Sequence, residues 1–92
     1  MIKSFAHKGL EHFYRQGSRA GIQPNHATKL RRQLTALDGT SDLAVLDVPG
    51  WHLHRLIGSR AGYWSIRVSG NWRLIFVFSD GNASFVDYVD YH

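Results

Sequence analysis

The sequence predicts an α+β domain in which two N-terminal helices pack on one side of a twisted antiparallel sheet of four to five strands. Apolar residues recur at helical spacing over residues 1–47, whereas they alternate with polar residues, as in strands, over residues 51–92. A chain of 92 residues is long enough for one small hydrophobic core and too short for two. We therefore expect residues 1–92 to form a single domain.

The first half contains a short opening strand, two helices and one further turn. Residues 2–5 read as the strand, Gly17 ends the first helix, and Pro24 suits the first position of the second, where its missing N–H has no helical partner to lose. Ser41 and Asp42 cap a last turn that reaches Leu46. The first helix presents one apolar face, made of Leu10, Phe13 and Tyr14. The second has the apolar stripe Ala27, Leu30, Leu34 and Leu37, with Lys29, Arg31, Arg32 and Gln33 off it.

The second half reads as antiparallel strands. A first strand covers roughly residues 52–57, and a last one roughly residues 83–91. Asp80-Gly81 is a strong signal for a tight hairpin between the last two strands. Alternation in the two middle strands predicts one aromatic face, made of Trp64, Ile66, Val68, Trp72, Leu74, Phe76 and Phe78. If the helices cover that face, Arg67 and Arg73 stand together on the opposite one.

Composition narrows the class of function. The chain has no cysteine, which excludes disulfides and thiol catalysis, and its net charge of +4 favours an acidic partner such as nucleic acid. No apolar run approaches the roughly 18 residues of a spanning helix, and the start lacks a signal-peptide core. We therefore expect a cytoplasmic protein that does not enter a membrane.

Two histidine-containing segments and several arginines are candidates for chemistry. The chain ends Asp90-Tyr91-His92, where Asp90 and His92 point one way along a strand and Tyr91 the other. His52 and His54 would share a face of the first strand, as acid–base groups, as phosphate ligands, as a metal pair that still needs a third ligand, or simply as solvent-exposed side chains. Arg73 offers a rigid fork of donors for phosphate. A larger basic or stacking surface would include Arg55, Arg60, Arg67 and Tyr63.

Four segments of the sequence resemble a known family. They are MIKSFAHKGLEHFY, GIQPNHATKLRRQLTALD, LHRLIGSRAGYWSIRVSGNWRLIFVF and the closing DYVDYH, and together they span nearly the whole chain in order. They are similar to the HigB-type toxins of the RelE/ParE superfamily, the plasmid maintenance killer group. The resemblance implies a RelE-like fold, ribosome-dependent endoribonuclease activity (an mRNA interferase acting in the A site of the 70S ribosome) and a HigA-type helix-turn-helix antitoxin that holds a monomeric toxin in a hetero-oligomer.

The resemblance also implies roles for particular residues. The family's catalytic residues fall on His54, Arg73, Asp90, Tyr91 and His92. RNA carries its own nucleophile, so the 2′-hydroxyl can attack the phosphate without metal or other cofactor. Arg73 then stabilises the phosphoryl charge and His54 and His92 transfer protons, with base and acid unassigned between them. The chain departs from several relatives at Ile57, where they carry lysine.

The sequence is also compatible with three rival functions. A ParE-like gyrase inhibitor would share the fold without needing the five catalytic candidates. A basic RNA-binding module would need Arg73 but not His92. A metal-dependent enzyme would be built on His52, His54 and His92.

Overall fold

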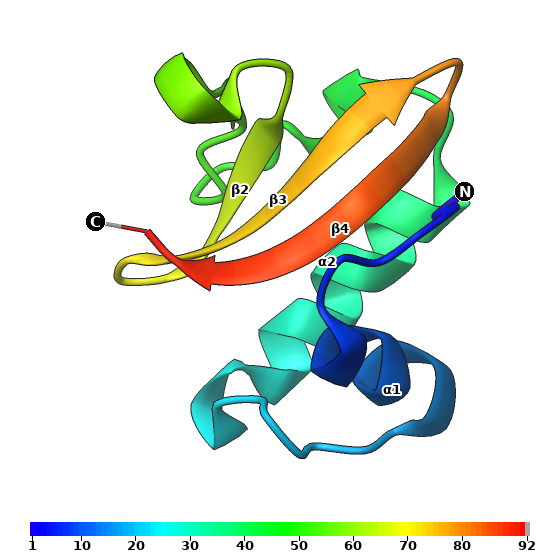
Figure 1. The fold of residues 1–92 in the computed structure, drawn as a ribbon, viewed down its shortest axis with the longest axis vertical. Coiled ribbons are helices and arrows are strands. Elements are labelled where there is room, and N and C mark those ends of the chain that lie inside the picture. Colours follow the sequence, from blue (N-terminus) through cyan, green and yellow to red (C-terminus); the bar gives the residue numbers. More distant parts are fainter. Residues whose placement is uncertain (92) are drawn as a thin grey trace.

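A computed structural model describes residues 1–91 of the chain and confirms the α+β architecture. It contains two α-helices, α1 (Lys8–Gln16) and α2 (Ala27–Gly39), and the strands β1 (His54–Arg55), β2 (Trp64–Ser69), β3 (Trp72–Ser79) and β4 (Asn82–Asp90). Single 3₁₀ turns cover η1 (Pro24–His26), η2 (Leu43–Leu46) and η3 (Gly58–Arg60). The strands follow one another in the order β1-β2-β3-β4, each antiparallel to the next, and α1 and α2 lie on one side of this sheet (Figure 1).

The opening segment adds to the sheet, but in the parallel sense. Isolated bridges join Ile2 to Ala83 and Phe5 to Val86, and the Lys3 N–H donates to the Ala83 carbonyl at 2.7 Å. The segment therefore covers the outer edge of β4, where unpaired main-chain groups would otherwise face solvent.

Local sequence signals set the helix boundaries. The His7 side chain caps α1, its Nδ1 accepting from the Leu10 N–H at 2.9 Å. Gly17 ends that helix with a φ of 78°, a left-handed conformation that glycine adopts without strain. Asp42 caps η2 by accepting from the Ala44 N–H at 3.0 Å, as the sequence predicts.

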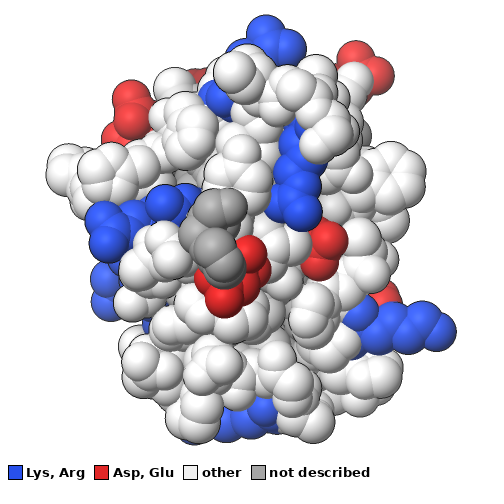
Figure 2. Space-filling view, turned by 60° about the vertical axis from the view of Figure 1, so that its left-hand side comes forward, with Lys and Arg blue, Asp and Glu red and all other residues white. Residues whose placement is uncertain are grey.

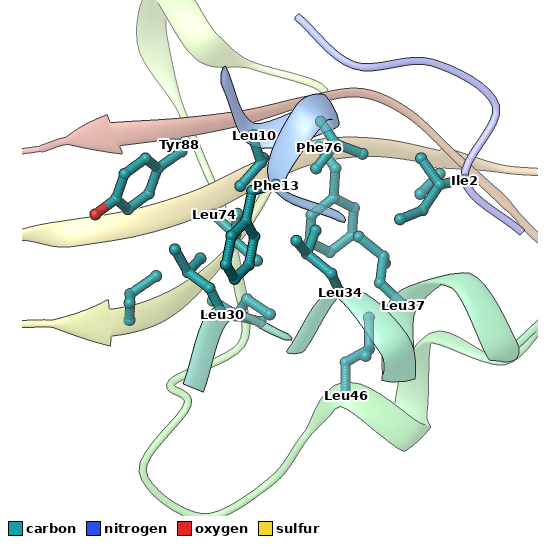
Figure 3. Close-up of a cluster of buried hydrophobic side chains, with 14 of the residues drawn as sticks. Ile2, Leu10, Phe13, Leu30, Leu34, Leu37, Leu46, Leu74, Phe76 and Tyr88 are labelled. Carbon is teal, nitrogen blue, oxygen red and sulfur yellow. The ribbon is translucent and has the colours of Figure 1, made fainter. Parts of the chain in front are cut away.

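The core lies between the two helices and the facing side of the sheet (Figure 3). Side chains from α1, α2, η2, β3 and the N-terminal segment meet there and are almost completely buried. They include Ile2, Leu10, Phe13, Leu30, Leu34, Leu37, Leu46, Leu74 and Phe76. The predicted aromatic face of the middle strands is thus confirmed as the face under the helices, which leaves its opposite face for the site.

One helix residue departs from the predicted amphipathic pattern. The sequence predicts Gln33 off the apolar stripe of α2, yet the residue is fully buried. Its Nε2 donates to the Arg67 carbonyl on β2 at 2.8 Å. A buried amide requires a partner, and here that partner is the strand main chain, so Gln33 ties α2 to β2.

The first strand is shorter than predicted. The expected strand over residues 52–57 reduces to His54–Arg55, because His52 adopts a left-handed φ of 51° that interrupts an extended chain. The Leu56 N–H donates to the Tyr63 carbonyl at 2.9 Å, which closes the loop that carries η3. At the other hairpin, Asp80 and Gly81 both have positive φ, 53° and 76°, which confirms the tight turn between β3 and β4.

Candidate active site

Two arginines lie side by side on the face of the sheet that the helices do not cover. The register pairs Arg67 on β2 with Arg73 on β3, and pairs Ser65 with both His54 on β1 and Ile75 on β3. Residues two apart on a strand share a face, so His54, Arg67 and Arg73 stand on the same face. The prediction that Arg67 and Arg73 stand together on this face is confirmed, and His54 joins them there.

Arg73 is anchored to the turn that precedes it. Its Nη1 donates to the Gly70 carbonyl at 2.6 Å and to the Trp72 carbonyl at 3.2 Å. Burial lowers the pKa of Arg73, the positive charge of Arg67 lowers it further, and Tyr91 raises it. A guanidinium keeps its charge under such shifts. The site therefore holds a half-buried cation next to a second cation.

His54 is held in a defined orientation. Its Nδ1 lies 2.7 Å from the His52 carbonyl. A carbonyl only accepts, so Nδ1 carries the hydrogen, and in the neutral ring the lone pair is on Nε2. The side chain is exposed. His54 thus presents a proton acceptor to solvent, as a general base requires.

Tyr91, directly after β4, lies against the turn between β2 and β3. The Tyr91 N–H donates to the Asn71 carbonyl at 2.7 Å, and Figure 1 shows the end of β4 near that turn. The Arg60 guanidinium lies over the Tyr91 ring, 5.3 Å from its centroid. Arg60, Arg73 and Tyr91 are therefore brought together from three separate segments.

Asp90 lies on the other side of the sheet from Arg73. The register pairs Asp90 with Trp72 and Arg73 with Val89, so alternation directs the carboxylate away from the guanidinium. The structure therefore does not bring Asp90 to the face that carries Arg73 and Tyr91. The fifth predicted catalytic residue, His92, lies outside the described residues, and so does the metal set that would need it.

The remaining predicted RNA contacts divide between the two faces. Arg55 pairs with Trp64, and its guanidinium lies 5.5 Å from that ring, so it stands on the face opposite to His54. Tyr63 is half-buried, and its carbonyl serves the loop bond from Leu56. Arg60 and Arg67 are thus the basic residues that accompany Arg73.

The candidate site is an open surface. No pocket hollows the part of the molecule formed by residues 1–91. From the register and strand spacing, the Cα atoms of His54 and Arg73 lie about 12 Å apart, with Arg67 on the strand between them. Figure 2 shows Lys and Arg side chains spread over this side of the molecule, with acidic side chains among them.

A buried polar contact behind the site was not predicted from the sequence. His26 from η1 is buried, and its Nδ1 lies 2.7 Å from the Tyr88 hydroxyl. The Tyr88 ring stacks on Trp72, with centroids 4.5 Å apart. Trp72 is the neighbour of Arg73 on β3, and Tyr88 lies near the end of β4, three residues before Tyr91. These contacts and Gln33 therefore hold the strand ends that carry the site.

Within residues 1–91 the structure supports neither a metal site nor a membrane-spanning helix. Over residues 1–91, no three His, Asp or Glu side chains are grouped so that they could hold a metal ion. His52 precedes β1 with its left-handed φ, so it and His54 do not share a strand face as predicted. None of the described helices has the length and apolar character needed to cross a membrane.

Comparisons with known proteins agree with this architecture. Residues 3–92 match the family described as the RelE-like toxin of the type II toxin–antitoxin system HigB. A Proteus vulgaris protein named endoribonuclease HigB is 40% identical over 92 residues, which cover all of both chains. A Vibrio cholerae serotype O1 protein named toxin HigB-1 is 38% identical over 96 residues, covering all of this chain and 98% of the relative. With its helices on one face of an antiparallel sheet and a match along nearly its whole length, the chain belongs to the HigB-like family of RelE-like toxins, whose members act within type II toxin–antitoxin systems and so have an antitoxin partner.

Proposed function

We propose that this toxin is a ribosome-dependent endoribonuclease that cleaves mRNA on the face that carries His54, Arg67 and Arg73. The adjacent pair Arg67 and Arg73 carries the proposal. Like charges opposite each other on a sheet destabilise it. An anion between them relieves that repulsion, and the phosphodiester of RNA is such an anion. The name of the Proteus vulgaris relative points to the same substrate class.

The proposed reaction uses the nucleophile that RNA itself supplies. A base removes the proton of the 2′-hydroxyl, whose oxygen attacks the adjacent phosphorus. The bond from phosphorus to the 5′-oxygen breaks, and an acid protonates that oxygen. The products are a 2′,3′-cyclic phosphate and a 5′-hydroxyl end, with no redox change and no metal step.

The described geometry favours particular roles. His54 has the free Nε2 of a general base, and Arg73 stabilises charge on the phosphoryl oxygens. His92 is proposed as the second proton-transfer group, and Tyr91 as a stacking or positioning group for a nucleotide. Asp90 acts through His92 rather than through Arg73, since alternation turns it to the other face. Arg55 stands on that other face too, which favours contact with the ribosome over contact with the scissile phosphate.

The openness of the site supports the proposed dependence on the ribosome. Positioned acid–base groups contribute about 10²- to 10⁴-fold, and the remainder must come from alignment of the attacking and leaving oxygens. The surface formed by residues 1–91 has no pocket and offers little such alignment. The ribosomal A site would hold the mRNA in place, and a HigA-type helix-turn-helix antitoxin would keep the monomeric toxin inactive in the cytoplasm.

The test compares purified toxin on mRNA-loaded 70S ribosomes with toxin on the same mRNA alone. The expected result is site-selective cutting on ribosomes, cyclic phosphate and 5′-hydroxyl ends, and little cutting of free mRNA. Rapid, selective cutting of free mRNA would contradict ribosome dependence. Absence of cutting together with stabilised gyrase cleavage complexes would replace the proposal with gyrase inhibition.

A further inference from the structure

The contact between Arg60 and Tyr91 links the loop after β1 to the end of the chain. The Arg60 guanidinium carbon lies 5.3 Å from the centre of the Tyr91 ring. A cation within about 6 Å of an aromatic face is attracted to it, and the attraction grows as water is excluded. The Nη1 atom of Arg60 is itself buried and has no hydrogen-bond acceptor within residues 1–91. The ring is therefore a principal contact of this guanidinium.

The two ends of this contact differ in how firmly they are held. Arg60 belongs to a loop closed by main-chain hydrogen bonds, from Tyr63 N–H to the Arg60 carbonyl at 3.1 Å and from Leu56 N–H to the Tyr63 carbonyl at 2.9 Å. Tyr91 lies beyond the last residue of β4, has one main-chain bond to Asn71, and is 39% exposed. The loop thus holds Arg60 in place, and Arg60 in turn restrains the Tyr91 side chain, which the sheet itself does not restrain.

We infer that Arg60 is a positioning residue that fixes the Tyr91 ring beside Arg73. The inference rests on the proposed nuclease function and assigns a different role to Arg60 from direct contact with RNA. Arg60 acts through Tyr91 in this arrangement, so its loss slows the chemical step more than it weakens binding of the ribosome.

A double-mutant cycle with a matched control tests this role. Arg60→Met keeps the length of the side chain and removes its charge and planar group. Tyr91→Leu removes the ring. Arg31→Met is the control, because Arg31 on α2 lies 4.8 Å from the Phe13 ring and its loss removes the same charge and the same kind of contact away from the site. Cleavage is measured as kcat and KM on mRNA-loaded ribosomes.

Arg60→Met is expected to lower kcat by about threefold to tenfold with KM within about twofold, since cation–π contacts have that strength. In the Tyr91→Leu background the same change should cost less than about twofold. Arg31→Met should leave both constants unchanged. Additive losses, or a raised KM with unchanged kcat, would overturn the positioning role and indicate direct binding of RNA.

A second readout does not depend on cleavage. In NMR spectra of the free protein, Arg60→Met is expected to shift the Tyr91 ring signals and to speed hydrogen exchange of the Tyr91 amide, whereas Arg31→Met leaves both unchanged. Tyr91 signals that stay in place would overturn the inference. If the wild-type protein does not cut RNA at all, the proposed function fails, while the NMR comparison still decides whether Arg60 fixes Tyr91.

Discussion

Arg67 and Arg73 are direct cross-strand partners, so two guanidinium groups leave β2 and β3 side by side. Burial is the main cause of the lowered pKa of Arg73, and the neighbouring positive charge of Arg67 lowers it further. Gln33 holds the Arg67 carbonyl from behind, and the Gly70 carbonyl holds the Arg73 side chain. The fold thus keeps two like charges adjacent, which is the arrangement expected where an anion binds.

Removing one of these charges should raise the stability of the protein and lower its activity. Arg67→Gln is expected to raise the free energy of unfolding by about 0.5 kcal/mol, because a like-charge pair is relieved, and to lower cleavage. Urea denaturation and the ribosome cleavage assay measure the two effects. A destabilised variant with unchanged cleavage would mean that the pair serves the fold rather than the substrate.

His54 should be needed for the chemical step. His54→Gln is expected to lower the single-turnover cleavage rate by about 10²-fold or more, because the proton acceptor at Nε2 is lost. The control is His52→Asn, since asparagine tolerates the left-handed φ of 51° and keeps the carbonyl that orients His54. Equal losses in both variants would show that the loop conformation matters and the His54 imidazole does not.

His26 should make stability depend on pH near neutrality. Burial, together with the charge of Lys29, lowers the pKa of His26 below its usual 6.5. As the pH falls below about 6.5 the unfolded chain binds a proton before the folded one does, so the free energy of unfolding falls until the lowered folded pKa is passed. Urea denaturation between pH 7 and pH 5 should show this loss in the wild type and a smaller one in His26→Gln. An identical pH dependence in both proteins would contradict it.

Asp38 should affect stability at acidic pH and should raise the pKa of Tyr14. Its carboxylate accepts from the Ile2 N–H and from the Tyr14 hydroxyl, both at 2.8 Å, and the bond from Ile2 is the main cause of its lowered pKa. Its contribution to stability is therefore present above the unfolded pKa of 3.8 and lost as the pH falls through the lower folded value. Burial and Asp38 raise the pKa of Tyr14 to about 12.

Asp38→Asn tests both effects. The variant should lack the loss of stability in acid below the unfolded pKa, and the pKa of Tyr14 should fall part of the way back towards 10.0, because burial remains. Acid titration followed by circular dichroism and ultraviolet titration of tyrosine measure the two. A Tyr14 pKa that stays at about 12 in Asp38→Asn would show that burial alone raises it.

Local signals in the sequence predict most of the fold. Gly17 and Asp42 cap helical segments within one turn of the chain, and Asp80-Gly81 forms a tight turn from its own two residues. None of these three features depends on distant contacts. Burial of Gln33 is different, because its partner is a carbonyl 34 residues away on β2. The short β1 likewise depends on the left-handed conformation of His52, for which histidine gives little signal.

In the candidate site, too, some features follow from local sequence and others depend on distant contacts. Alternation within β2 and β3 predicts that Arg67 and Arg73 share the face opposite the helices. The stacking of Arg60 on Tyr91 joins a loop to the chain end, and periodicity carries no information about such a contact. Arg55 lies on the other face because the register sets it opposite Trp64, and register between distant strands cannot be read from either strand alone.

The central claim is that this face cuts mRNA on the ribosome, and mapping of RNA 5′ ends after induction in cells tests it most directly. Wild-type toxin is expected to create new 5′-hydroxyl ends within translated reading frames, and Arg73→Ala and His92→Gln, produced to the same level, are expected to create none. New ends that persist unchanged in both variants, or growth arrest by the wild type without any new ends, would contradict the account.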